Sequence, residues 1–148
     1  MSSRLFQDVR EQKGLAYSVF SYHSAYQDSG MVAIYAGTGK SQVNQLFETI
    51  QDTLNILKAD GITEKELKNC KEQLKGNLML GLESTNSRMS RNGKNELMLG
   101  THRSLDEVIQ LIDSVTLQGV NDMAKFVFTD DHAISLVSPD GVIPSGLK

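Results

Sequence analysis

The chain has 148 residues, of which 39% are hydrophobic and 22% are charged, and its formal net charge is −3. This composition is typical of a folded globular protein and argues against a disordered chain or a basic nucleic-acid-binding module. The sequence shows no run of 18 apolar residues and no secretory signal, so we expect no membrane span and a cytoplasmic location. The length predicts a single domain over residues 1–148.

A short helix and a hairpin are the first predicted elements. A serine at position 2 or 3 can cap a helix that ends at Gly14. Residues 16–26 are aromatic, β-branched and small, which is typical of a strand. Turn residues at 27–30 and a second apolar run at 31–36 complete the pattern of an antiparallel hairpin.

Helical spacing of apolar residues dominates the rest of the chain. The expected elements are a helix over 41–59, a helix opening at the Thr63–Glu66 capping box, a helix ending at Gly100, a helix opening at the Ser104–Glu107 capping box, a helix capped by Thr116, and a strand over 133–138. The one cysteine, Cys70, lies on an apolar stripe of the second helix and is expected to be buried.

This order of elements indicates an α+β arrangement. Three strands make a thin sheet for so many helices. We therefore expect that further strands precede these elements and that the chain is the later part of a larger domain.

Two site patterns are incomplete. Residues 37–41, Gly-Thr-Gly-Lys-Ser, resemble the end of a phosphate-binding loop, but Ile34 stands where that pattern needs a glycine. A strand-to-helix turn is the favoured interpretation, and a small nucleotide-binding regulator is the alternative. The histidines His23, His102 and His132 have no ligand partners at helical spacing, which argues against a zinc site made by this chain alone.

Arg10 and Tyr17 are the most informative pair in the sequence. They lie seven residues apart, where a helix would end and a strand would begin, so a guanidinium and a phenol can meet at one corner. Both groups are donors that can stabilise an oxyanion, which makes them candidate catalytic residues. The structural alternative assigns Arg10 to the helix dipole and Tyr17 to a half-buried strand position.

Longer stretches of the sequence carry a family resemblance. They are residues 2–19, 30–37, 74–85, 87–89, 104–108 and 115–116. In this order they resemble the pitrilysin/insulinase family of zinc metallopeptidases, peptidase family M16, and most of all its smaller bacterial members related to mitochondrial processing peptidase. The resemblance extends over residues 2–138.

This resemblance implies two similar halves that close around a chamber, with zinc held by the N-terminal half. Each half would be an α+β two-layer fold, an antiparallel sheet covered on one face by helices. Arg10 and Tyr17 match the arginine and tyrosine that the C-terminal half supplies for substrate binding and transition-state stabilisation. The zinc motif is absent here. The resemblance therefore implies a fragment of the C-terminal half, truncated at its N-terminal side and inactive alone, with zinc in the intact protein held outside this chain.

The expected partners follow from the same resemblance. They are an unfolded peptide substrate, which the hairpin edge near residues 18–22 would bind as an added strand, and the missing N-terminal half or a partner subunit. The alternative is a non-catalytic scaffold half of a peptidase-like complex. Unpaired strand edges also predict that the chain associates with itself.

Overall fold

The computed structural model describes residues 3–140 and residue 143, and the chain divides into two compact units. One unit comprises Met1–Gly61 with Met123–Lys148, and the other comprises Ile62–Asp122. The elements are η1 (Phe6–Gln12), β1 (Ser18–Ala25), β2 (Gly30–Gly37), η2 (Lys40–Gln42), α1 (Val43–Asp60), α2 (Glu64–Gly81), α3 (Thr85–Leu99), α4 (Leu105–Ser114) and α5 (Leu117–Val127). A hairpin combined with these helices confirms the predicted α+β class. The assignment of residues 1–148 to a single domain stays a prediction.

The first helix, η1, is short and has the wide geometry of a π-helix. The N–H of Lys13 donates to the carbonyl oxygen of Asp8, five residues earlier, at 3.2 Å. The turn ends at Gly14, as predicted, and the φ of +58° at this residue is left-handed and favours glycine.

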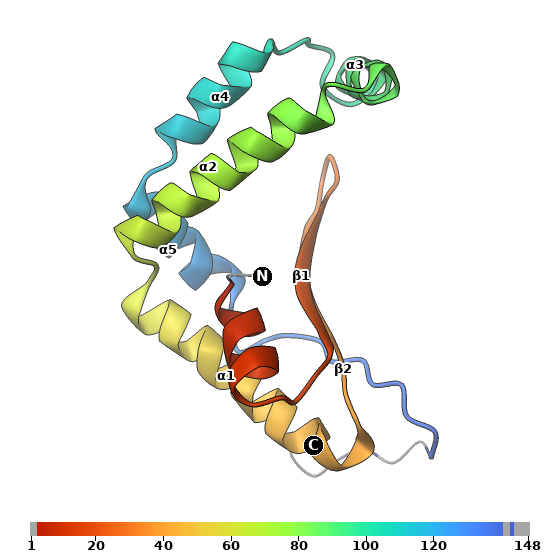
Figure 1. The fold of residues 1–148 in the computed structure, drawn as a ribbon, viewed down its shortest axis with the longest axis vertical. Helices are drawn as coiled ribbons and strands as arrows, with labels where there is room; N and C mark the ends of the chain where they lie inside the picture. The colour runs from red at the N-terminus through yellow and green to blue at the C-terminus, as the bar shows by residue number, and fades with distance from the viewer. Residues whose placement is uncertain (1–2, 141–142, 144–148) are drawn as a thin grey trace. The chain divides into compact units, whose positions relative to one another are not determined.

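β1 and β2 form the predicted antiparallel hairpin. Its register places Val19 opposite Ala36 and Phe20 opposite Tyr35. Val19 is buried, whereas the stacked rings of Phe20 and Tyr35, 5.1 Å apart at their centroids, are half-exposed on the other face. Figure 1 shows the hairpin as a long twisted ribbon whose turn points away from α1. One face near the open end of the hairpin is therefore used for packing, and the other presents aromatic side chains.

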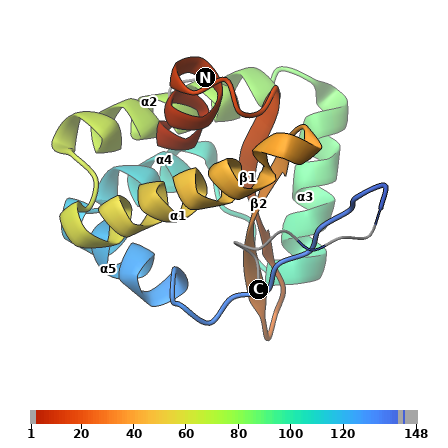
Figure 2. The same ribbon diagram turned by 90° about the horizontal axis from the view of Figure 1, so that it is seen from below.

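The core of the first unit lies where η1, α1 and the open end of the hairpin meet. Its buried hydrophobic members are Val9, Leu15, Ala16, Val19 and Leu46, with Leu5, Phe6, Ala36 and Ile50 packed against them. Figure 2 shows η1 lying beside α1, and Val9 of η1 is fully buried in this contact. The short helix is therefore held by side-chain packing, since an isolated helix of seven residues is not stable in water.

The strand predicted over residues 133–138 is wrong. These residues form irregular structure, and the sheet that the described part of the chain forms contains only β1 and β2. The apolar side chains of Ile134, Leu136 and Val137 are exposed. A strand needs a neighbouring strand for its N–H and C=O groups, so an apolar pattern alone does not create one.

The second unit is helical, and two of its helices begin at the predicted capping boxes. The N–H of Thr63 donates to Glu66 Oε2 at 2.7 Å, and the N–H of Glu66 donates to Thr63 Oγ1 at 3.2 Å. Ser104 and Glu107 form the same reciprocal pair, at 2.6 and 3.2 Å. α3 ends at Gly100, whose φ is +61°, as predicted. These boundaries are confirmed because each depends on residues close in the sequence.

The expected burial of Cys70 is wrong, since its side chain is exposed. α2 meets α4 through the face that carries Leu67, Lys71 and Lys75, and Leu67 is the buried residue of α2. Cys70 lies about 100° away from Lys71 around the helix.

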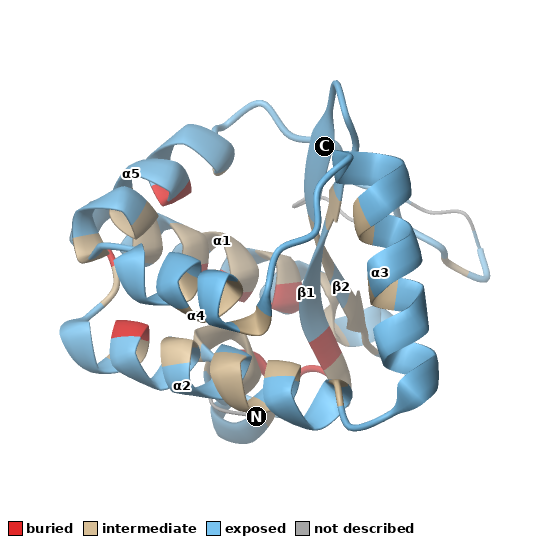
Figure 3. Ribbon diagram, turned by 90° about the horizontal axis from the view of Figure 1, so that it is seen from above, coloured by how far each residue is buried: buried red, intermediate tan, exposed pale blue. Residues whose placement is uncertain are grey.

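Figure 3 shows no buried position on α3. Within residues 3–140 and 143, no helix is both long enough and apolar enough to cross a membrane.

The capping box of α4 predicts a pH-dependent contribution to stability. Hydrogen bonds from Ser104, chiefly from its backbone N–H, hold the pKa of Glu107 below its usual value. The stabilisation is therefore present above the unfolded-state pKa, about 4.3, and is lost as the pH falls through the lower folded-state pKa. We expect Glu107→Gln to lower the free energy of unfolding at neutral pH, and the difference from the wild type to shrink in acid. Urea unfolding followed by circular dichroism across pH measures this.

Asp106→Asn is the matched control, because Asp106 lies in the same first turn and also carries a negative charge. It reports the general effect of a first-turn charge on the helix dipole. Identical pH profiles for the two variants would contradict a specific role for the Ser104–Glu107 hydrogen bonds.

Candidate functional site

Arg10 and Tyr17 meet at the corner between η1 and β1. The guanidinium carbon Cζ of Arg10 lies 4.6 Å from the centroid of the Tyr17 ring and 4.9 Å from the centroid of the Phe6 ring. These distances are within the range of cation–π interactions, so the guanidinium lies close to both rings. The structure thus brings together the two residues that sequence reasoning selected.

Both side chains of this pair reach solvent. Tyr17 is 83% exposed, and the side chain of Arg10 is 35% exposed. Arg10 Nε lies 3.6 Å from Glu11 Oε1, and the half-exposed Glu11 makes this a weak ion pair. The half-buried position that the structural alternative required for Tyr17 is not observed. The phenol and the guanidinium are available to a ligand that approaches the corner.

The backbone beneath the pair is fixed by burial and by hydrogen bonds. Leu15 and Ala16, which are adjacent in the segment between η1 and β1, are buried. The N–H of Leu15 donates to the carbonyl oxygen of Val9 at 2.8 Å, and the hydroxyl of Thr38 donates to the carbonyl oxygen of Leu15. The guanidinium and the phenol therefore project from a backbone segment that is buried and hydrogen-bonded. Such support suits a site that must hold its groups in position.

The segment that resembled a phosphate-binding loop is a packed turn. Thr38 is engaged with Leu15, and Lys40 forms an ion pair with Asp140. The N–H of Gln42 donates to the carbonyl oxygen of Gly39 at 2.9 Å and begins the short helix η2. These contacts favour the structural interpretation of residues 37–41 over nucleotide binding.

The histidines do not converge on a metal site. His23 lies on β1, His102 Nε2 lies 2.8 Å from Glu96 Oε2, and His132 Nε2 lies 3.1 Å from Gln51 Nε2. In the part of the chain that the structure describes, no group of three histidine, cysteine or acidic side chains is placed to hold a metal ion. The described residues therefore do not fit zinc.

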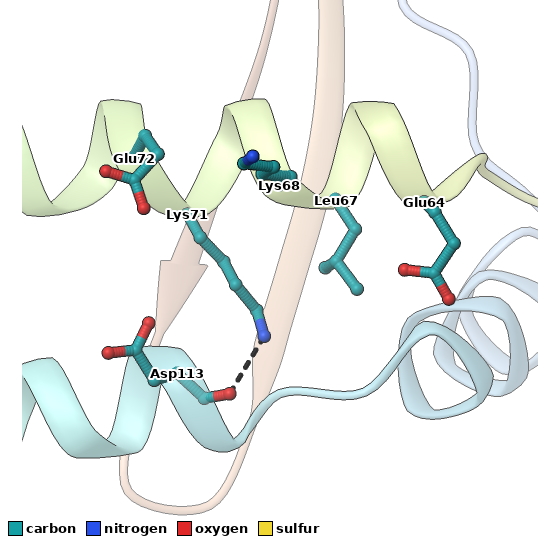
Figure 4. A pocket seen from close by; sticks show the side chains of 6 residues that line it. All are labelled: Glu64, Leu67, Lys68, Lys71, Glu72 and Asp113. Atoms are coloured by element: carbon teal, nitrogen blue, oxygen red, sulfur yellow. Dashed lines mark hydrogen bonds between the residues drawn. The ribbon is translucent and has the colours of Figure 1, made fainter.

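Sequence reasoning missed a polar depression in the second unit, between α2 and α4. It is lined by Glu64, Leu67, Lys68, Lys71, Glu72 and Asp113 (Figure 4). Lys71 Nζ donates to the backbone oxygen of Asp113 at 2.8 Å, and Lys75 Nζ contacts Glu72 and the Asp113 carboxylate. Hydrogen bonds to Glu72 and then to Asp113 raise the pKa of Lys75. These groups pair with one another, so we assign them to the helix contact rather than to catalysis.

Comparison with known families gives one match in the first half of the chain. Residues 1–74 match the family described as the peptidase M16 inactive domain. They include η1, the hairpin, α1 and the start of α2, and hence the whole Arg10–Tyr17 corner.

Curated relatives resemble nearly all of this chain. The uncharacterized zinc protease YmxG of Bacillus subtilis is 66% identical over 145 residues, which are 98% of this chain and 36% of that protein. An uncharacterized zinc protease of Streptomyces coelicolor is 42% identical over 139 residues, which are 94% of this chain and 30% of that protein. The chain thus spans about a third of the length of these relatives.

Solved structures share the fold. A conserved protein from Enterococcus faecalis V583 is similar with a TM-score of 0.70 and 29% identity, over 83% of this chain and 28% of that chain. A chain of complex III2 from Candida albicans is similar with a TM-score of 0.73 and 24% identity, over 85% of this chain and 30% of that chain. At that identity, the second similarity is one of fold alone.

Gly14, whose φ is left-handed, allows a direct test of the backbone conformation at the corner between η1 and β1. A Cβ at Gly14 would meet nothing within 4 Å, so Gly14→Ala would strain only the backbone. We expect a loss of about 1–2 kcal/mol in the free energy of unfolding. Chemical denaturation of this chain measures it.

Gly76→Ala is the matched control for this substitution. Gly76 lies inside α2, and a Cβ there also meets nothing within 4 Å. Without a left-handed φ, the alanine should stabilise the helix by about 0.5–1 kcal/mol. A neutral or stabilising effect of Gly14→Ala would contradict the need for a left-handed residue at the corner.

Proposed function

Since this chain belongs to the peptidase M16 family, we propose that it forms the substrate-facing part of the C-terminal half of a zinc endopeptidase. The observation that carries this proposal is the exposed pair of Arg10 and Tyr17, whose guanidinium lies over the phenol ring above a buried backbone segment. The family match includes that corner, and the curated relatives are named zinc proteases. A chain that spans about a third of such relatives would contribute part of a site and would be inactive alone.

The chemistry of the two side chains suits peptide hydrolysis. When a peptide carbonyl is attacked, its oxygen gains negative charge, and an aimed O–H or N–H donor lowers the barrier by about 3–4 kcal/mol. The exposed phenol of Tyr17 is such a donor. The guanidinium of Arg10, 4.6 Å from the ring centroid, limits the positions of the ring and keeps N–H donors for a second substrate carbonyl.

The hairpin that follows the corner supports an extended substrate. β1 begins directly after Tyr17 and pairs with β2 along one edge, and its residues Ser18–Ala25 include no acidic or basic side chain apart from His23. An unfolded peptide can add to such a strand through backbone hydrogen bonds, beside the aromatic face formed by Phe20 and Tyr35. We therefore propose unfolded peptides as the substrate class.

The proposal assigns zinc to another part of the protein. The described residues do not fit the metal, so its ligands and the catalytic base would come from the N-terminal half or from a partner subunit. This chain would contribute donors across the substrate from that centre. We also propose the cytoplasm as its location, because an exposed unpaired thiol at Cys70 suits a reducing compartment.

Tyr17→Phe tests the role of the phenol in the full-length protein. The variant keeps the ring against Arg10 and removes only the O–H donor. We expect kcat for cleavage of an unfolded peptide to fall about 10²–10³-fold with KM little changed, because the donor acts in the transition state. The measurement is steady-state kinetics of the peptide cleavage that a zinc chelator abolishes.

Tyr26→Phe is the matched control, since Tyr26 is also exposed but lies at the hairpin turn. It should keep wild-type kinetics. Wild-type turnover in Tyr17→Phe would count against the catalytic role and in favour of the alternative function.

That alternative is a non-catalytic scaffold half of a peptidase-like complex. The family description as an inactive domain favours it. In that case Arg10 and Tyr17 would serve structure only, and substitution of either would leave turnover unchanged. The presence of a His-x-x-Glu-His motif in the preceding part of the gene would favour the enzyme, and its absence would favour the scaffold.

Among the described residues, no third strand pairs with the hairpin, and its open edges predict self-association of this chain. Met31, Val32 and Tyr35 of β2 are exposed apolar residues, and exposed strand edges pair with other chains. We expect light scattering to show dimers or larger species whose fraction rises with concentration. Val32→Lys should reduce association, because a charge on an exposed strand disfavours pairing.

Leu97→Lys on α3 is the control, because it adds the same charge at an exposed apolar residue outside the hairpin. It should leave strand-mediated association unchanged. A monomer at all concentrations, or equal effects of the two lysines, would contradict pairing through the hairpin.

A further inference from the structure

We propose that Thr49 and Thr53 of α1 are positioning residues that hold η1, and through it Arg10, against Tyr17. Both threonines are buried, with exposed fractions of 2% and 5%. Buried hydroxyls inside a helix need hydrogen-bond partners. Thr53 is hydrogen-bonded to Asp8 of η1, and Thr49 is hydrogen-bonded to Lys13 at the end of η1. The inference rests on the proposed function, because it assigns the geometry of the proposed site to residues outside it.

The first contact is made at the C-terminal end of η1. Lys13 Nζ donates to Thr49 Oγ1 at 3.0 Å, and the Thr49 hydroxyl in turn donates to the carbonyl oxygen of Gln45 at 2.8 Å. The hydroxyl of Thr49 thus acts as acceptor and donor at once, so its orientation is fixed from both sides.

The second contact is made near the start of η1. The hydroxyl of Thr53 lies 3.2 Å from Asp8 Oδ2 and 2.8 Å from the carbonyl oxygen of Thr49. Its single proton is shared between these two acceptors. Thr53 therefore connects the Asp8 side chain to the backbone of α1.

The spacing of these contacts matches the backbone of both helices. Thr49 and Thr53 are four residues apart, so they lie on one face of α1. Asp8 and Lys13 are five residues apart and are joined by the π-type hydrogen bond of η1. Arg10 lies between them in the sequence, so the two contacts hold the turn on both sides of the guanidinium.

Hydrogen bonds add a direction that apolar packing lacks. Val9 anchors η1 in the core through apolar contacts, and such contacts are non-directional. The two hydroxyl contacts restrict rotations of η1, because hydrogen bonds weaken steeply with angle. A rotation of η1 would move the guanidinium away from the Tyr17 ring, and a misplacement of about 1 Å costs about 10²-fold in rate.

Thr53→Val and Thr53→Ser form the matched pair for the test in the full-length peptidase. Valine keeps the shape and removes the hydroxyl, whereas serine keeps the hydroxyl. We expect Thr53→Val to lower kcat about tenfold with KM little changed, and Thr53→Ser to keep turnover near the wild type. Steady-state kinetics with an unfolded peptide measures both.

A double-mutant cycle with Tyr17→Phe separates positioning from general stability. If Thr53 acts through the site, Thr53→Val should cost about tenfold in the wild-type background and less than about twofold in the Tyr17→Phe background. A merely structural role would give the same fold-change in both backgrounds. Lys13→Met, at an exposed position, tests the Thr49 contact in the same cycle if the buried variants do not fold.

The outcomes distinguish the two proposals. Equal kcat for Thr53→Val, Thr53→Ser and the wild type, with a loss in Tyr17→Phe, would overturn the positioning role and leave the proposed function intact. Additive losses would also overturn the positioning role. Wild-type turnover in Tyr17→Phe would overturn both.

Discussion

The contact between η1 and α1 is the constraint on which the rest of the first unit depends. Val9 is fully buried at this contact, and the hydroxyls of Thr49 and Thr53 bond the residues on either side of Arg10. A helix of seven residues would not persist without such support. Since the hairpin leaves from the end of the same helix, the direction of β1 depends on that contact as well.

The corner between η1 and β1 combines a buried backbone segment with accessible hydrogen-bond donors. Leu15 and Ala16 are buried beneath it, whereas Tyr17 projects into solvent beside a guanidinium. A group exposed in this way gains no stability from burial, so its position suits recognition of another molecule better than it suits packing. The described residues provide these donors, and among them no group of three histidine, cysteine or acidic side chains is placed to hold a metal ion.

The sequence predicted the features that depend on neighbouring residues. The capping boxes at Thr63 and Ser104 and the glycine at 14 determine helix ends locally, and the seven-residue spacing of Arg10 and Tyr17 was sufficient to place them at one corner. The strand at 133–138 and the burial of Cys70 were wrong, because each depends on whether a distant segment covers it. Thr49 and Thr53 were not singled out, since their partners lie 36 and 45 residues away.

These long separations have a consequence for the order of folding. The hairpin joins residues that are close in the chain, so it can form early, whereas η1 gains its fixing contacts only after a large loop has closed. During synthesis from the N-terminus, Asp8 has no Thr53 to bond until the ribosome has made most of α1. We therefore expect the guanidinium and the phenol to align only after this part of α1 has been made and has packed against η1.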